Sequence, residues 1–372
     1  MTSFMYYIAL FIVLLLIVLF GGHYFLYFSV VRFFAISGIL KKVLLVSIVF
    51  LSVSFIFALL LAQLNEGFLV KVFYFISSFW LSFLFYFILA AAAVWLIFWA
   101  GKIFDLNVNF SFWAVIFFIS AFSVSLYGIW NAFNLQVRDI TVDIPNLPSV
   151  WENKRIVQIS DLHLGLIYRE ALMKNLVEKI NFIKPEIVVI TGDLFDSMDG
   201  QFDFLPEWLN KIQAEKGIYF VTGNHETYLG VNEVFSVLEK TKITVLRDEV
   251  VDLDGLKLIG IDYPDRSENK DVIAVLNSLR KDFFNQPNIL LYHSPVFINQ
   301  FKEAGINLQL SGHTHGGQIF PMNLIAKFIY KGYSYGFHQI GDYALYATSG
   351  AGTWGPTMRI GTHSEIVVIT IK

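Results

Sequence analysis

The sequence predicts a two-part fold in which apolar helices that cross a membrane precede an α/β domain. Three observations lead to this prediction. Charged residues are almost confined to one part of the chain, four long apolar stretches lie in the other part, and the charged part alternates short apolar strands with helices. A chain of 372 residues is long enough for two domains of ordinary size.

Charge divides the chain near residue 135. Of the 57 Lys, Arg, Asp and Glu residues, 50 (57 minus 7) follow this position. The seven that precede it are Arg32, Lys41, Lys42, Glu66, Lys71, Lys102 and Asp105. The later part carries 22 basic residues (27 minus 5) and 28 acidic ones (30 minus 2), a formal net charge of −6. Domains that bind nucleic acid are typically basic, so neither a nucleic-acid partner nor a nuclease is expected.

Four stretches are long and apolar enough to cross a bilayer as helices, which takes about 20 residues. They cover about 4–31, 43–64, 72–100 and 110–134. We therefore predict that residues 1–134 form a transmembrane anchor and that the lipid bilayer is a partner of the chain. Away from the ends of these stretches the one ionisable side chain is His23, which we expect to be a packed or interfacial histidine and not a ligand. Transporters usually carry charged groups at mid-membrane, so these stretches are expected to anchor and not to transport.

The loops between the spans predict the orientation. Arg32, Lys41, Lys42 and Lys102 lie on one side of the membrane, and Lys71 and Arg138 lie on the side of the two termini. Basic loops stay in the cytoplasm, so four residues against two place the later domain outside the cytoplasm.

Residues 135–154 are polar and contain Pro145 and Pro148, which favours a linker, and residues 155–372 are expected to form one domain. Short apolar runs predict strands, and amphipathic runs predict helices. The expected strands are 155–160, 186–191, 217–222, 288–293 and 306–313, and the expected helices are 169–184 and one from about 231. This alternation is typical of an α/β domain with buried sheets.

Each expected strand runs into a polar motif, and the carboxyl ends of strands are where open α/β sheets place ligand sites. The motifs are Asp161-Leu-His163, Gly192-Asp193-Leu-Phe-Asp196, Gly223-Asn224-His225-Glu226, His293-Ser-Pro and Gly312-His313-Thr-His315. One Asp or His in such a place is more often a turn or core residue. Five of the eight histidines fall in these motifs, however, and the ordered set indicates a metal site. Carboxylate oxygen and imidazole nitrogen suit Mn, Fe and Zn, and the chain has no cysteine.

This ordered set resembles the calcineurin-like metallophosphoesterase pattern, D-x-H, G-D-x-x-D, G-N-H-[DE], H and G-H-x-H. The resemblance covers about 150–372, and the wording SGHTHGGQ with the tail SGAGTWGPTMRIG is most similar to bacterial membrane-associated members. It implies a four-layer α/β/β/α sandwich of two mixed sheets. It also implies a hydrolase of phosphoester or pyrophosphate bonds that uses two divalent metal ions, most often Mn, with Fe, Zn or Mg as alternatives.

The resemblance also implies a role for each motif residue. Asp161, His163 and His315 would hold the first metal, Asn224, His293 and His313 the second, and Asp193 both. Asp196 and Glu226 match positions that orient the ligands. His225 matches the histidine that protonates the leaving group or steadies the transition state. Two such ions lower the pKa of a bound water, which makes it a nucleophile at neutral pH.

The sequence thus predicts cleavage of a phosphodiester or pyrophosphate bond at the membrane surface, in a phosphorylated small molecule or a lipid-linked substrate. One alternative is a UDP-diacylglucosamine-type pyrophosphatase of lipid A synthesis, although such a precursor is made in the cytoplasm. Another is a transporter or sensor with a regulatory phosphoesterase-like domain, and a third is a non-catalytic binding module, which the complete ligand set disfavours. The oligomeric state stays open.

Residues 320–340 are apolar and aromatic, with Lys327 and Lys331. They are expected either to pack on the sheet as a strand and loop, or to form an interfacial loop that reaches lipid.

Overall fold

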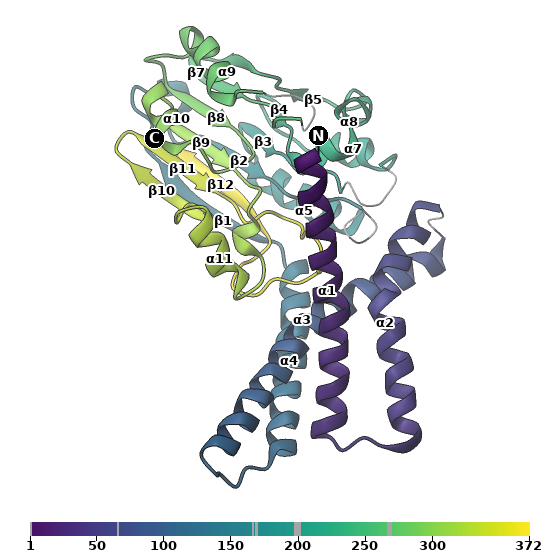
Figure 1. Ribbon diagram of the computed structural model, residues 1–372. Helices are drawn as coiled ribbons and strands as arrows, with labels where there is room; N and C mark the ends of the chain where they lie inside the picture. The colour runs from purple at the N-terminus through teal and green to yellow at the C-terminus, as the bar shows by residue number, and fades with distance from the viewer. Residues whose placement is uncertain (1, 65–66, 166, 168–169, 197–201, 266–269) are drawn as a thin grey trace. The chain divides into compact units, whose positions relative to one another are not determined.

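The structure is a computed structural model that describes residues 2–64, 67–165, 167, 170–196, 202–265 and 270–372 (Figure 1). The chain forms two compact units. The first takes in the residues up to Ile129 together with Gly355–Thr357, and the second takes in Trp130–Trp354 and Met358–Lys372.

Four helices make up almost all of the first unit: α1 (Thr2–Phe33), α2 (Gly38–Leu64), α3 (Phe68–Ile103) and α4 (Phe110–Phe133). By length and composition, α2, α3, α4 and the Leu16–Phe33 part of α1 could each cross a membrane. Of the two expected alternatives for His23, the structure shows the packed one, because the side chain is buried and its Nε2 accepts a hydrogen bond of 2.8 Å from Trp80 Nε1.

Two six-stranded sheets form the centre of the second unit, and both are mixed. In the first, β12 runs antiparallel to β2 and the other neighbours are parallel. In the second, β10 and β6 run antiparallel to their neighbours. The first sheet has the order β1 (Gln136–Val142), β12 (Glu365–Ile371), β2 (Arg155–Ile159), β3 (Ile187–Thr191), β4 (Ile218–Val221), β5 (Ile243–Val245). The second has the order β10 (Gly336–Ile340), β11 (Tyr343–Ala347), β9 (Leu308–Ser311), β8 (Asn288–Leu291), β7 (Leu256–Gly260), β6 (Glu249–Leu253).

Alternation along the buried strands builds four layers. In β3, Ile187 and Val189 face a core shared with the second sheet, and Val188 and Ile190 face helices on the other side. The helices over the first sheet are α5 (Glu170–Ile183), α6 (Leu205–Leu209) and α8 (Val231–Leu238), and those over the second are α9 (Val272–Leu279) and α10 (Ile298–Ala304). The expected α/β/β/α sandwich of two mixed sheets is therefore confirmed. All five expected strands and both expected helices are present, although Arg169, at the expected start of the first helix, lies outside the described residues.

The structure differs from the expected linker at 135–154. Residues 136–142 form the edge strand β1, which pairs with β12 in parallel, and Trp151 is fully buried with its Nε1 donating to Leu253 O. Most side chains of β1 are exposed, and two are charged, so its sequence lacks the apolar alternation that predicts a strand.

Candidate metal centre

The structure brings together the seven expected metal ligands and His225. Asp161 and His163 follow β2, Asp193 follows β3, and Asn224 and His225 begin α7 (Asn224–Leu229) directly after β4. From the second sheet, His293 follows β8, and His313 and His315 follow β9. Seven of the eight are buried, and His313 is half-buried.

Asp161, His163 and His315 form one group whose ligand atoms all lie within 4.8 Å of one another. The Nε2 atoms of His163 and His315 are 3.0 Å apart, and His315 Nε2 lies 3.6 Å from Asp161 Oδ1. Asp161 Oδ1 also accepts the backbone N–H of His313 at 2.9 Å, which joins the loops after β2 and β9.

Asp193, His293 and His313 form a second group within the same limit. Asn224 lies between its two imidazoles, with Oδ1 at 2.7 Å from His313 Nδ1 and 3.2 Å from His293 Nε2. Asp193 Oδ2 lies 3.2 Å from His293 Nε2 and 3.9 Å from His163 Nε2. Asp193 therefore stands between the two groups.

His225 lies beside the first group. Its ring centroid is 4.5 Å from that of His163, and its backbone N–H donates to Asp193 Oδ1 at 2.9 Å. Its Nδ1 is 3.9 Å from Asp196 Oδ1, a distance that suits an ion pair when the imidazole is protonated. Tyr228 and Trp354 bring aromatic rings to within 5.6 Å and 6.4 Å of its centroid.

The backbone holds these side chains in a conformation that L-residues rarely adopt. Five of the candidate ligands have φ between 44° and 71°, namely Asp161, His163, Asp193, His313 and His315. Each such residue costs about 1–3 kcal/mol, and strain of this kind gathers at functional sites. Glycine is required next to them, because a Cβ at Gly312 or Gly223 would collide with the Asp161 or Asp193 carboxylate.

Burial dominates the electrostatics of the centre. It lowers the pKa of His163 to about 3 and that of His313 to about 4, and it holds the pKa of His315 well below its usual value. These three imidazoles are therefore neutral at pH 7 and offer lone pairs to a metal.

His293 and Asp193 behave differently. Burial acts to lower the pKa of His293, but the charge of Asp193 and the hydrogen bond to it raise that pKa to about 9. Burial likewise acts to raise the pKa of Asp193, but His293 holds it well below its usual range. The two side chains form an ion pair that a bound cation would replace.

The donor set fits divalent metals. Two imidazole nitrogens bound to one ion at about 2.0–2.1 Å lie about 2.9–3.4 Å apart, and the Nε2 atoms of His163 and His315 are 3.0 Å apart. The buried Nδ1 of His163 has no hydrogen-bond partner among the described residues.

Glu226 ties the loop after β3 to the start of α7. Its Oε1 accepts the backbone N–H groups of Leu194 (2.8 Å) and Phe195 (3.2 Å). Its Oε2 accepts those of Asp193 (2.9 Å) and Gly223 (2.6 Å). Glu226 thus holds the backbone of Asp193 and Gly223 beside the candidate ligands, and its role in orienting metal ligands stays a prediction.

Arg359 was not identified from the sequence, although it stands in the quoted tail. It is fully buried, and its Nη2 donates to the carbonyls of Ser349 (2.5 Å) and Gly352 (2.6 Å). Nη2 also lies 3.4 Å from His315 Nδ1. An arginine in an otherwise uncharged tail was the available signal, because a buried charge needs partners.

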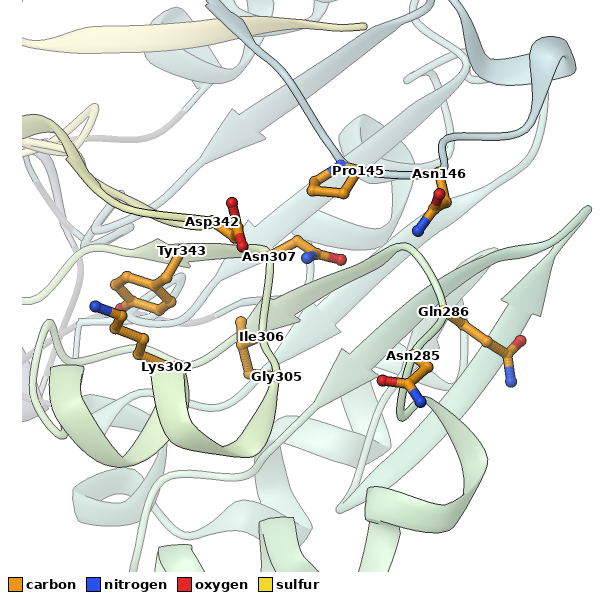
Figure 2. A pocket seen from close by; sticks show the side chains of 10 residues that line it. All are labelled: Pro145, Asn146, Asn285, Gln286, Lys302, Gly305, Ile306, Asn307, Asp342 and Tyr343. Atoms are coloured by element: carbon orange, nitrogen blue, oxygen red, sulfur yellow. The ribbon is translucent and has the colours of Figure 1, made fainter.

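One pocket lies near the candidate centre, and another lies away from it. One of about 480 Å³ is lined by Thr222, at the carboxyl end of β4, and by Tyr263, whose ring is 5.6 Å from that of His293. Another of about 410 Å³ is lined by residues that include Lys302, Asn307 and Tyr343 (Figure 2). It lies at the amino ends of β8, β9 and β11, opposite the metal-bearing loops, so it is not part of the candidate centre.

Comparison with known proteins identifies the family. Residues 154–317 match the family model described as calcineurin-like phosphoesterase. An uncharacterized metallophosphoesterase of Campylobacter jejuni is 33% identical over 69% of this chain and 70% of its own length. An uncharacterized metallophosphoesterase of Aquifex aeolicus is 32% identical over 66% of this chain and 95% of its own length.

A transmembrane protein with metallophosphoesterase domain from Danio rerio is 32% identical over 67% of this chain, which spans 60% of that protein. Together with the four candidate spans, this likeness indicates a membrane protein. The chain belongs to the calcineurin-like phosphoesterase family and is a phosphoesterase hydrolase of a family that uses divalent metals.

Proposed function

We propose that the chain hydrolyses a phosphodiester or pyrophosphate bond at the membrane surface with a dinuclear metal centre. The observation that carries the proposal is the position of Asp193, whose Oδ2 faces His293 at 3.2 Å and His163 at 3.9 Å. A carboxylate between two groups of donors suits a bridge between two ions. One ion would be held by Asp161, His163 and His315, the other by Asn224, His293 and His313, and Asp193 would contact both.

Two divalent ions held there, for which we propose Mn with Fe, Zn or Mg as alternatives, would supply an activated water and would neutralise phosphoryl oxygens. The chain's own groups handle the leaving oxygen. His225, whose Nδ1 lies 3.9 Å from Asp196 Oδ1, would protonate the leaving oxygen or steady the transition state. Tyr263 and the 480 Å³ pocket beside it would receive part of the substrate next to the second ion.

The proposed substrate is a phosphorylated small molecule or a lipid-linked phosphoester, and the proposed orientation of the catalytic domain is extracytoplasmic. The loop charges support that orientation. The chain has no native cysteine, so one introduced at the exposed Phe182 can be tested in intact cells with a membrane-impermeant maleimide. Labelling is expected, and labelling only after lysis would place the domain in the cytoplasm.

The activity is tested on the full chain in detergent, stripped with a chelator and reloaded with one metal at a time. Turnover is measured on a soluble phosphodiester, a nucleotide pyrophosphate, a nucleotide-linked lipid and a phospholipid, with Asp193→Asn as the blank. Metal-dependent turnover of at least one substrate, absent from the blank, is expected. Metal-loaded protein that cleaves none of them would refute the proposal, and a preference for the nucleotide-linked lipid would favour the pyrophosphatase alternative.

A further inference from the structure

The helix α11 (Met322–Ile329) presents apolar side chains to the outside of the second unit, which we call the catalytic unit. None of its eight residues is buried against the described parts of the chain. Phe328 is 85% exposed, Ile329 63% and Leu324 58%. Helices of soluble domains turn such residues toward a core, so a contiguous apolar face of this kind marks a contact surface.

The charges of the same segment indicate which partner it contacts. Lys327 lies within α11 and Lys331 follows it, and residues 320–340 contain no Asp or Glu. Exposed apolar and aromatic residues with nearby lysines suit the headgroup region of an anionic bilayer. The expected packing of this segment on the sheet applies to residues 336–340, which form β10, but not to the helix.

The last turn of α4 belongs to the catalytic unit and fixes where the chain enters the bilayer. Asn131 Nδ2 donates to the carbonyls of Arg359 (2.9 Å) and Thr362 (2.8 Å), and Ser364 Oγ donates to Ala132 O (2.7 Å). Only two residues separate α4 from β1, so the end of the helix and the start of the strand lie at most about 11 Å apart. With α4 as a membrane span, the segment 359–364 that is bonded to its last turn would lie close to the membrane surface.

The same segment carries α11. Phe320 N donates to Ile360 O at 2.9 Å, and Ile360 N donates to Gln318 O at 3.0 Å, immediately before the helix begins. A Cβ at Gly361 would lie 3.0 Å from Asn323 Nδ2 of α11. Within the catalytic unit, α11 and the end of the fourth span are thus both attached to residues 359–364.

The metal centre is close to the helix as well. The segment His315–Gly317 ends five residues before α11, and the ring of Tyr330 lies 6.2 Å from that of His313. We propose that α11 is a membrane-contact helix whose apolar face enters the headgroup region of an anionic bilayer. The site beside it then meets phosphate groups at the depth of lipid headgroups, a consequence that rests on the proposed function, whereas the contact itself does not.

A depth measurement tests the contact without reference to hydrolysis. Because the chain lacks cysteine, Phe328→Cys provides a single site for an environment-sensitive fluorophore. The matched control is Phe182→Cys, since Phe182 is 87% exposed and lies near the end of α5, just before the amino end of β3 and away from the metal-bearing loops. Both labelled full-length chains are placed in vesicles of phosphatidylcholine and phosphatidylglycerol that contain lipids with a nitroxide on the acyl chain.

The label at position 328 is expected to shift its emission to the blue and to be quenched several-fold more strongly than the label at 182. Equal, weak quenching at both positions would overturn the proposal. A blue shift at 328 without quenching by lipid would also overturn it, because a protein surface would then cover the helix. A catalytically inactive chain with a quenched label would refute the proposed function alone.

Discussion

Replacing Glu226 by Gln is expected to loosen the loops that carry the candidate metal ligands. The substitution turns one carboxylate oxygen into an NH₂ group, so two of the four backbone N–H groups would face another donor. Each buried hydrogen bond lost in this way costs about 1–3 kcal/mol, which gives about 2–6 kcal/mol in all. For a domain of roughly 150–250 residues this corresponds to a fall in Tm on the order of 10 °C.

The assay is thermal unfolding of the metal-free full chain in detergent, followed by tryptophan fluorescence. It is measured at pH 8, because burial and the nearby Asp193 raise the pKa of Glu226 to about 7. Glu207→Gln is the matched control, since Glu207 is exposed and forms an ion pair with Lys211, a contact worth about 0–1 kcal/mol. If the two variants lowered Tm equally, the carboxylate of Glu226 would not be what holds these loops.

Three further predictions concern the centre itself. His225→Ala is expected to keep its metal content and lose about 10²–10⁴-fold in turnover, and near-normal turnover would remove His225 from the mechanism. Gly312→Ala should lower metal affinity, because the added methyl group would collide with the Asp161 carboxylate. The control is Gly21→Ala, whose methyl group would meet no atom within 4 Å beyond its own stretch of helix among the described residues. Equal metal affinities in the two variants would contradict the steric argument. The pKa of His293 is raised from 6.5 to about 9, so the protonated imidazole stabilises the folded, metal-free protein. This stabilisation is fully present below pH 6.5 and is lost as the pH rises through 9. The Tm of the metal-free protein should therefore fall between pH 7 and 9, less so in His293→Gln, and a constant Tm in the unmodified chain would count against the ion pair.

The sequence predicted the two-part fold and the gathering of the eight residues for a physical reason. Parallel strands in one sheet all end at the same edge, so polar motifs after buried strands must meet there. This gathers the motifs after β2, β3 and β4 at one edge of the first sheet and those after β8 and β9 at one edge of the second. The packing of the two sheets then brings the loops after β2 and β9 together, so that His163 Nε2 and His315 Nε2 lie 3.0 Å apart although about 150 residues separate them.

Other features depend on packing that the sequence does not display. The left-handed φ of Asp161 and His313 follows from the surrounding loops and leaves no composition signal. Strand β1 is exposed and charged, and its place in the sheet is decided by its parallel partner β12, more than 200 residues later. Arg359 acquires its role only where its guanidinium meets carbonyls of residues 349–352.

The count of metal ions per chain tests the central claim most directly. The full chain is saturated with Mn, freed of unbound metal and analysed for metal per mole of protein, alongside Asp193→Asn, His315→Ala and His313→Ala. A centre shared by two groups of ligands predicts about two ions per unmodified chain, about one in each histidine variant, and weakened binding of both in Asp193→Asn. A single ion in the unmodified chain, or full occupancy of both positions in Asp193→Asn, would contradict a dinuclear centre bridged by Asp193.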